Sequence, residues 1–207
     1  NKSAVENAKR YFEKYAKLKR TFEALTEQTK ETKEEIDHLN SISNALDIAR
    51  EEEDLAAIRK ELSDTGYVRH HFQKGKQNTR KAPKSKPLHY ISSDGFHMYV
   101  GKNNYQNDEL TFKFATGNDW WFHAKAAAGS HVIVKTEGNE LPDHTFEEAA
   151  RLAAHYSKAR EQEKAEIDYV QKKHIKKPNG AKPGFVVYYT NYSMTISTDI
   201  TGIEEAE

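Results

Sequence analysis

The chain has 207 residues, and its 32 basic and 32 acidic side chains give a formal net charge of zero. A hydrophobic content of 36% and a mean hydropathy of −0.94 are low for one globule, and they indicate a long polar helix joined to a smaller globular part. Because there is no cysteine, disulfides and thiolate metal sites are excluded. No apolar run approaches the roughly 18 residues of a membrane span, so no membrane partner is expected.

The N-terminal third of the chain is predicted to be helical. No Gly or Pro interrupts residues 3–64, and apolar residues recur there at spacings of three and four. Ser3 and Glu6 form a capping box, and a break is expected near residues 50–53. The apolar stripe needs a partner helix, which the sequence does not contain. We therefore expect a fragment of a longer protein, whose missing arm or a second copy (a homodimer) covers the stripe.

A change of composition follows the helical part. Residues 69–86, RHHFQKGKQNTRKAPKSK, carry seven Lys or Arg residues and no acid. This composition is typical of a solvated linker, and it also suits a tether that binds phosphates. The two interpretations are compatible.

From Leu88 onward the hydrophobic period becomes two, which indicates strands. Strands are predicted at LHYIS, FHMYV, LTFKF, WWFHA, HVIVK, AEIDYVQ, GFVVYYT and SMTIS. Asp94-Gly95 predicts a hairpin turn, and Thr145 with Glu148 is expected to cap a helix that ends near Arg160. The closing GIEEAE is expected to fray.

These elements predict an α+β fold, in which a long coiled-coil-type helix precedes a mostly antiparallel sheet with one main helix. The predicted domains are a helical arm at 1–65, a basic linker at 66–87 and an α+β domain at 88–207.

The segment DWWFHAKAAAGSHV, residues 119–132, holds both tryptophans of the chain. Ser130 and His131 are neighbours on a predicted strand and point to opposite faces, so they do not form a catalytic dyad. The spacing of Asp119, His123 and His131 matches no common metal-ligand motif. We therefore expect no enzyme activity, no metal and no cofactor.

Nucleic-acid binding fits these residue types better. RNA recognition uses aromatic faces for stacking, cations for phosphates, and amides or imidazoles for base edges. A basic run from Lys172 to Lys182 lies in a stretch with no acid between Asp168 and Asp199. Because Trp120 and Trp121 alternate across a sheet, at least one is expected in the core. The candidate nucleic-acid-binding residues are Lys102, Asn103, Asn107, Lys113, Trp120, His123, Lys125, His131, Lys158, Arg160, Lys176 and Lys177.

Several blocks of sequence together resemble a known family. DGFHMYVGKNNYQND (94–108), LTFKFA, the DWWFHAKAAAGSHV segment, AARLAAHYSKAR (149–160) and the GAKPGFVVY run resemble the NFACT-R domain of the RqcH and fibronectin-binding-protein-A-like family. ENAKRYFEKYAKLKR (6–20) and IRKELSDTGYV (58–68) resemble the returning arm of that family's coiled coil.

The resemblance implies a cytoplasmic, ribosome-associated quality-control factor. Such factors bind obstructed large ribosomal subunits and recruit tRNA for untemplated addition of alanine to the stalled chain. Peptidyl transfer belongs to the ribosome. The implied partners are tRNA, the large subunit, and the family's N-terminal domains and outgoing coiled-coil arm, which have no match here. The alternative is a surface adhesin that binds fibronectin.

Overall fold

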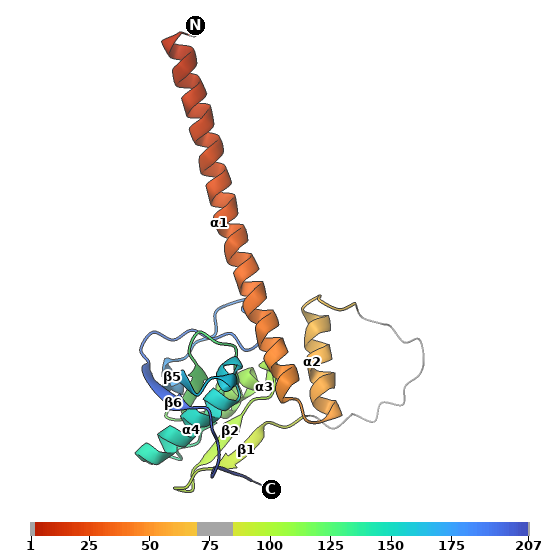
Figure 1. Ribbon diagram of the computed structural model, residues 1–207, viewed down its shortest axis with the longest axis vertical. Helices are drawn as coiled ribbons and strands as arrows, with labels where there is room; N and C mark the ends of the chain where they lie inside the picture. Colours follow the sequence, from red (N-terminus) through yellow and green to blue (C-terminus); the bar gives the residue numbers. More distant parts are fainter. Residues whose placement is uncertain (1–2, 70–84, 207) are drawn as a thin grey trace, which may run out of the picture. The chain divides into compact units, whose positions relative to one another are not determined.

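The computed structural model describes residues 3–69 and 85–206 (Figure 1). It divides into two units, residues 1–39 and 40–207. The first unit consists of most of helix α1 (Ala4–Ile48), which starts at the predicted capping box. The Ser3 amide donates to Glu6 Oε2 at 2.7 Å, and the Glu6 amide donates to Ser3 Oγ at 3.3 Å. No helix within the described residues is long and apolar enough to span a membrane.

The break predicted after α1 is confirmed. Helix α2 (Glu52–Asp64) begins after it, and the Glu51 side chain forms a capping box with Asp54. Ile42 and Ala45 at the end of α1 pack against Ile58 of α2, so the two helices share a small core of their own within the second unit. Most of the predicted linker, residues 70–84, lies outside the described residues.

One antiparallel sheet forms the centre of the second unit, with strand order β6-β5-β3-β4-β2-β1-β7. The strands are β1 (Leu88–Ile91), β2 (His97–Val100), β3 (Trp120–Ala124), β4 (Val132–Val134), β5 (Lys164–Gln171), β6 (Tyr192–Ser197) and β7 (Glu204–Glu205). The β1–β2 hairpin turns at the predicted Asp94-Gly95, where Gly95 has a φ of +85° that favours glycine. The predicted fold class is therefore confirmed.

The two faces of the sheet are covered by different elements. Helix α4 (Asp143–His155) packs on one face, where the core includes Met98, Phe122 and Leu152 (Figure 1). The other face is covered by α3 (Asn104–Glu109), a π-helix (Leu110–Phe114) and a segment around residues 175–188. Two short 3-10 helices, Lys158–Glu161 and Lys172–His174, flank β5.

This arrangement decides which tryptophan is inside. Trp121 is fully buried on the face under the π-helix. Trp120 is half-buried on the α4 face, where its ring centroid lies 4.9 Å from that of Phe146 and 5.8 Å from that of Tyr169. The alternation of neighbouring strand residues therefore places the two rings as expected.

Two of the predicted strands are not strands in the structure. LTFKF (110–114) is the π-helix, because α3, capped by the Asn103 side chain, continues directly into it. GFVVYYT (184–190) is irregular and makes one β-bridge, Val187 to Lys176. Its first residue is held by a long-range contact, since the Gly184 amide donates to Asp108 Oδ1 at 3.0 Å. Alternation over five residues does not distinguish a strand from one face of a helix.

The predicted ends of the last helix and of the chain are also wrong. Helix α4 begins at Asp143, with Pro142 as its N-cap, and ends at His155. Thr145 lies inside it and donates to Asp94 Oδ2 at 2.8 Å, so its hydroxyl fixes the hairpin turn. The C-terminal GIEEAE does not fray completely, because β7 pairs with β1.

Candidate nucleic-acid interface

Two of the predicted contact residues are buried in the turn after β2. The ammonium of Lys102 lies 2.6 Å from Asp54 Oδ1, and both side chains are under a tenth exposed. Asn103 caps α3, because its side chain accepts the Gln106 amide at 3.0 Å. The structure gives Lys102 and Asn103 structural roles: they join the turn to α2 and start α3.

Asn107 and His131 are buried against each other. Asn107 Oδ1 accepts the His131 amide at 3.0 Å. Gly101 permits this approach, since a Cβ built on it would lie 2.2 Å from Asn107 Oδ1. The His131 ring bonds to Thr111 Oγ1 at 2.8 Å, and burial lowers the pKa of His131 well below its ordinary value. The polar groups of Asn107 and His131 that were predicted to contact RNA therefore bond to other residues of the fold.

Other predicted cations are held by carboxylates. Lys158 and Arg160 both lie 2.5 Å from Asp47, near the end of α1. Hydrogen bonding from Lys158 is the main cause that lowers the pKa of Asp47. Lys125 on the loop after β3 pairs with Glu166 of β5 at 2.5 Å. These side chains remain partly accessible, but each cation already has an anionic partner.

Two further candidates, His123 and Lys177, lie on or beside the face under the π-helix, and a third, Trp120, lies on the opposite face. His123 stacks near Trp121, with ring centroids 5.5 Å apart, and burial lowers the pKa of His123. Lys177 pairs with Asp108. Trp120 offers only part of one ring on the opposite, α4 face. The predicted set is therefore not brought together into one surface.

Four lysines lie on two neighbouring segments of the fold, and we call them the basic edge: Lys113, Lys172, Lys173 and Lys176. Lys113 belongs to the π-helix, and the other three lie in and after the 3-10 helix that follows β5. Backbone hydrogen bonds join the 3-10 helix to the loop that follows the π-helix, since the Lys172 amide donates to Asp119 O at 2.9 Å and the Lys173 amide donates to Gly117 O at 3.1 Å. Among the described residues, no carboxylate lies within ion-pair distance of these four ammonium groups.

Asp119 fixes the loop that carries the basic edge. Its carboxylate accepts the Thr116 amide at 2.7 Å and the Thr136 amide at 3.0 Å, and it pairs with Lys135. Burial alone would raise the pKa of Asp119, but the bond from Lys135 and the amides hold it below its ordinary value. The single buried carboxylate thus ties the end of the π-helix to the segment after β4.

A row of aromatic rings next to this edge was missed in the sequence. On neighbouring strands, the His89 and Tyr99 rings stack in parallel with centroids 4.5 Å apart, and His97 stacks on His89 at 5.0 Å. The edge of Phe114 meets Tyr99 at 4.7 Å. The alternation in LHYI and HMYV places His89, His97 and Tyr99 on one face, so the pattern held this signal.

The chain matches two family models and several known proteins. The family model described as the NFACT protein RNA binding domain matches residues 86–190, and the model of the NFACT N-terminal and middle domains matches residues 1–81. The Rqc2 homolog RqcH of Bacillus subtilis (strain 168) is 38% identical over 200 residues, which are 96% of this chain and 34% of that protein. The Rqc2 homolog RqcH of Streptococcus suis (strain 05ZYH33) is 43% identical over 184 residues, 88% of this chain and 32% of that protein.

A solved structure has the same fold. It is the C-terminal part of the fibronectin/fibrinogen-binding protein from Streptococcus suis, with a TM-score of 0.82 and 39% sequence identity over 96% of this chain and 77% of that one. The chain spans about a third of the length of the curated relatives it matches. All four lysines of the basic edge fall within the segment that matches the RNA binding domain.

Proposed function

The chain belongs to the NFACT family, and on that premise we propose that it is the RNA-contacting C-terminal part of a ribosome-associated quality-control factor. The observation that carries the proposal is the basic edge. Its ammonium groups are free of carboxylate partners among the described residues, and they lie within the matched RNA binding domain. Unpaired cations on a rigid support attract phosphates and release counterions when they bind.

The finer part of the proposal concerns the RNA and the process. We infer that the basic edge contacts tRNA or ribosomal RNA on an obstructed large subunit, while the whole factor recruits tRNA for untemplated addition of alanine to the stalled chain. Relatives named Rqc2 homolog RqcH support this inference. The rest of the factor, including the outgoing coiled-coil arm, then acts as an intramolecular partner. A cytoplasmic location follows from this role. We assign the chain a binding role and no catalytic step.

The test compares two charge-matched triple variants of the 207-residue chain. One replaces Lys113, Lys173 and Lys176 of the basic edge by alanine. Labelled tRNA is titrated with wild type and variant over a series of salt concentrations. The slope of log K against log salt is negative, and each lost phosphate contact makes it less steep by about 0.7–0.9. Loss of all three contacts should therefore reduce its magnitude by about 2–3.

The control triple variant replaces Lys125, Lys158 and Arg160, which the structure shows paired with Glu166 or Asp47. It removes the same formal charge and should change the slope by less than half as much. Equal slopes for the two variants would contradict the assignment of the basic edge and leave only a diffuse effect of net charge.

Fibronectin binding is a second candidate, favoured by the description of the solved Streptococcus suis fragment. It predicts binding of this chain to immobilised fibronectin that depends little on salt and is unchanged when the basic edge is replaced. Binding of tRNA without binding of fibronectin would decide for the first proposal.

A further inference from the structure

A column of stacked aromatic rings crosses three neighbouring strands on the α4 face of the sheet. Phe122 of β3 stacks on Tyr169 of β5, with ring centroids 5.5 Å apart and ring planes 12° apart. Tyr169 stacks in turn on Tyr192 of β6, also at 5.5 Å, with planes 29° apart. The strand register places the members of each pair directly opposite one another. The column therefore runs from the core of the sheet toward its edge.

The outer end of this column is open. Phe122 is fully buried and Tyr169 is half-buried, but Tyr192 is 62% exposed. Strand β6 is the last strand of the sheet, so within the described part of the chain no further strand pairs beyond Tyr192. Because one face of the Tyr192 ring meets Tyr169, the opposite face and the rim of the ring are the parts left to solvent.

Two further rings hold the open end in place. The Trp120 ring centroid lies 5.8 Å from that of Tyr169 and 6.3 Å from that of Tyr192. Phe146 of α4 meets the Trp120 ring edge-on at 4.9 Å and the Tyr169 ring at 5.6 Å. The ring behind Tyr192 is thus fixed on several sides. A flat ligand that stacks on Tyr192 meets a surface that is already ordered, so little entropy is lost on binding.

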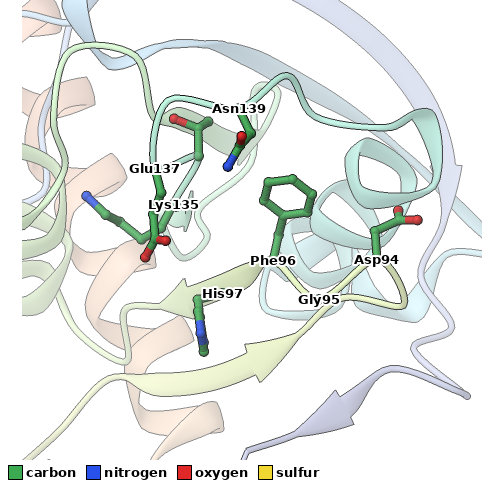
Figure 2. A pocket seen from close by; sticks show the side chains of 8 residues that line it. Asp94, Gly95, Phe96, His97, Lys135, Glu137 and Asn139 are labelled. Atoms are coloured by element: carbon green, nitrogen blue, oxygen red, sulfur yellow. The ribbon is translucent and has the colours of Figure 1, made fainter.

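The pocket at the β1–β2 hairpin offers no comparable ring from the second aromatic row. Glu137 and Asn139 line this pocket of about 220 Å³ together with His97. The His97 ring, however, turns away from both of them and toward His89, on which it stacks (Figure 2). The open end of an aromatic stack therefore lies at Tyr192.

The open ring is close in the fold to the lysines of the basic edge. Lys176 and Val187 form a β-bridge, in which each amide donates to the other residue's carbonyl at 2.9 Å. The β5–β6 pairing joins the same two segments again at Tyr169 and Tyr192. Lys172 lies between the two joins, and the three residues of chain from Tyr169 to Lys172 span at most about 11 Å. One short stretch of RNA can therefore reach both the ring and the lysines.

We propose that Tyr192 stacks one unpaired base of the RNA whose phosphates contact the basic edge. Every base has a π-face, so this platform accepts a base without selecting a sequence. In an A-form duplex the bases are stacked on one another and their faces are not available, so the platform selects single strands and loops over duplex RNA. The inference rests on the proposed RNA-binding function and names the form of RNA that it takes.

The experiment uses the full 207-residue chain, a short labelled single-stranded oligouridylate and an RNA duplex of equal length. Tyr192→Leu should weaken binding of the single strand by about tenfold, as expected for the loss of one stacked base. It should leave binding of the duplex and the salt slope unchanged, because no charge is removed. Tyr192→Phe keeps the ring and should bind the single strand as wild type does.

Tyr189→Leu is the matched control. Tyr189 lies in the same segment and is 83% exposed, but no aromatic ring stacks behind it among the described residues. It should weaken binding of the single strand by less than half as much as Tyr192→Leu. Equal losses for the two variants, an unchanged affinity in Tyr192→Leu, or an equal loss for the duplex would overturn the platform and leave the basic edge intact.

A separate outcome concerns the proposed function. If neither RNA binds to the wild-type chain, that function fails, and titration with AMP then decides the platform alone. The ring NMR signals of Tyr192 are identified by their absence in Tyr192→Leu. Shifts of these signals with AMP, but not with inorganic phosphate, support a stacking site for free nucleotides. Absent shifts, or equal shifts with phosphate, overturn it.

Discussion

Replacement of Lys102 by methionine should destabilise the second unit (residues 40–207, the sheet unit) without changing its electrostatic affinity for RNA. The Lys102 ammonium and the Asp54 carboxylate form a buried pair 2.6 Å apart. Lys102→Met keeps the length of the side chain and leaves Asp54 as a buried carboxylate without its cation. Losing one partner of a buried pair typically costs about 3–5 kcal/mol, because the remaining charge is uncompensated.

The other partners of Asp54 place the expected loss near the lower end of that range. Its carboxylate still accepts the Arg50 amide at 2.9 Å and the Glu51 amide at 3.2 Å, and it accepts the Ser85 hydroxyl. We therefore expect a loss of about 3 kcal/mol in the free energy of unfolding. For a unit of this size each kcal/mol lowers Tm by about 2–4 °C, so Tm should fall by about 6–12 °C.

Tryptophan fluorescence during urea unfolding is the appropriate assay, because both tryptophans lie in the sheet unit. Urea is uncharged and does not screen the ion pair as guanidinium would. The pKa of Asp54 also sets a pH test. Burial alone would raise that pKa, but the bonds from Lys102, Ser85 and the backbone hold it below its ordinary value of 3.8. The stability due to the pair is thus present above that value and is lost as the pH falls through the lowered pKa.

Lys125→Met is the matched control, since Lys125 also pairs with a carboxylate at 2.5 Å but both side chains are more than two fifths exposed. Exposed pairs contribute about 0–1 kcal/mol. Similar losses for the two variants, or a loss at Lys102 that does not shrink as the pH falls through the acidic range below 3.8, would refute the burial argument. A reduced salt slope for tRNA binding in folded Lys102→Met would return this lysine to the RNA interface.

Two further predictions concern the segment that holds both tryptophans. A Cβ at Gly129 would lie 2.8 Å from Ser157 Cβ, so Gly129→Ala should lower the free energy of unfolding by about 1–3 kcal/mol through overpacking. Gly117→Ala is the control, because the nearest atom to its Cβ would lie at 3.7 Å, and it should cost less than half as much. Equal urea midpoints for the two variants would contradict this prediction. Burial lowers the pKa of His123 and His131 below 6.5, so the folded chain binds fewer protons than the unfolded chain. As the pH falls from 6.5 to 5.5, the free energy of unfolding should therefore decrease by up to about 1.4 kcal/mol per pH unit for each histidine. A urea midpoint that stays constant across this window would contradict the prediction.

Local sequence rules predicted the elements whose partners are close in the chain. The Ser3–Glu6 capping box and the Asp94-Gly95 turn involve residues a few positions apart, and both are present. The π-helix at 110–114 escaped prediction, because its direction is set by α3 before it and by the Trp121 side of the sheet behind it. Neither influence is visible in five alternating residues.

The predicted site suffered from the same limit. The sequence does not show whether a lysine is paired, because the acidic residue that pairs with it can lie far away in the chain. Lys102 is paired by Asp54, and Lys158 is paired by Asp47. The stretch without acids between Asp168 and Asp199 was a better guide, because it limits the supply of local partners.

The distribution of acids explains why one set of cations stays free and another does not. Helices α1 and α2 bring Asp47 and Asp54 to the turn after β2 and to the end of α4, and there they neutralise the cations of the sheet unit. At the basic edge, the buried acid Asp119 is already occupied, because its carboxylate pairs with Lys135 and accepts the amides of Thr116 and Thr136. Charge pairing therefore ties the last turns of α1 and the start of α2 to the sheet within the second unit, and it leaves unpaired positive charge at the basic edge. This separation predicts that an acid introduced beside Lys173, at exposed Gly117, weakens tRNA binding more than an acid introduced beside Lys158.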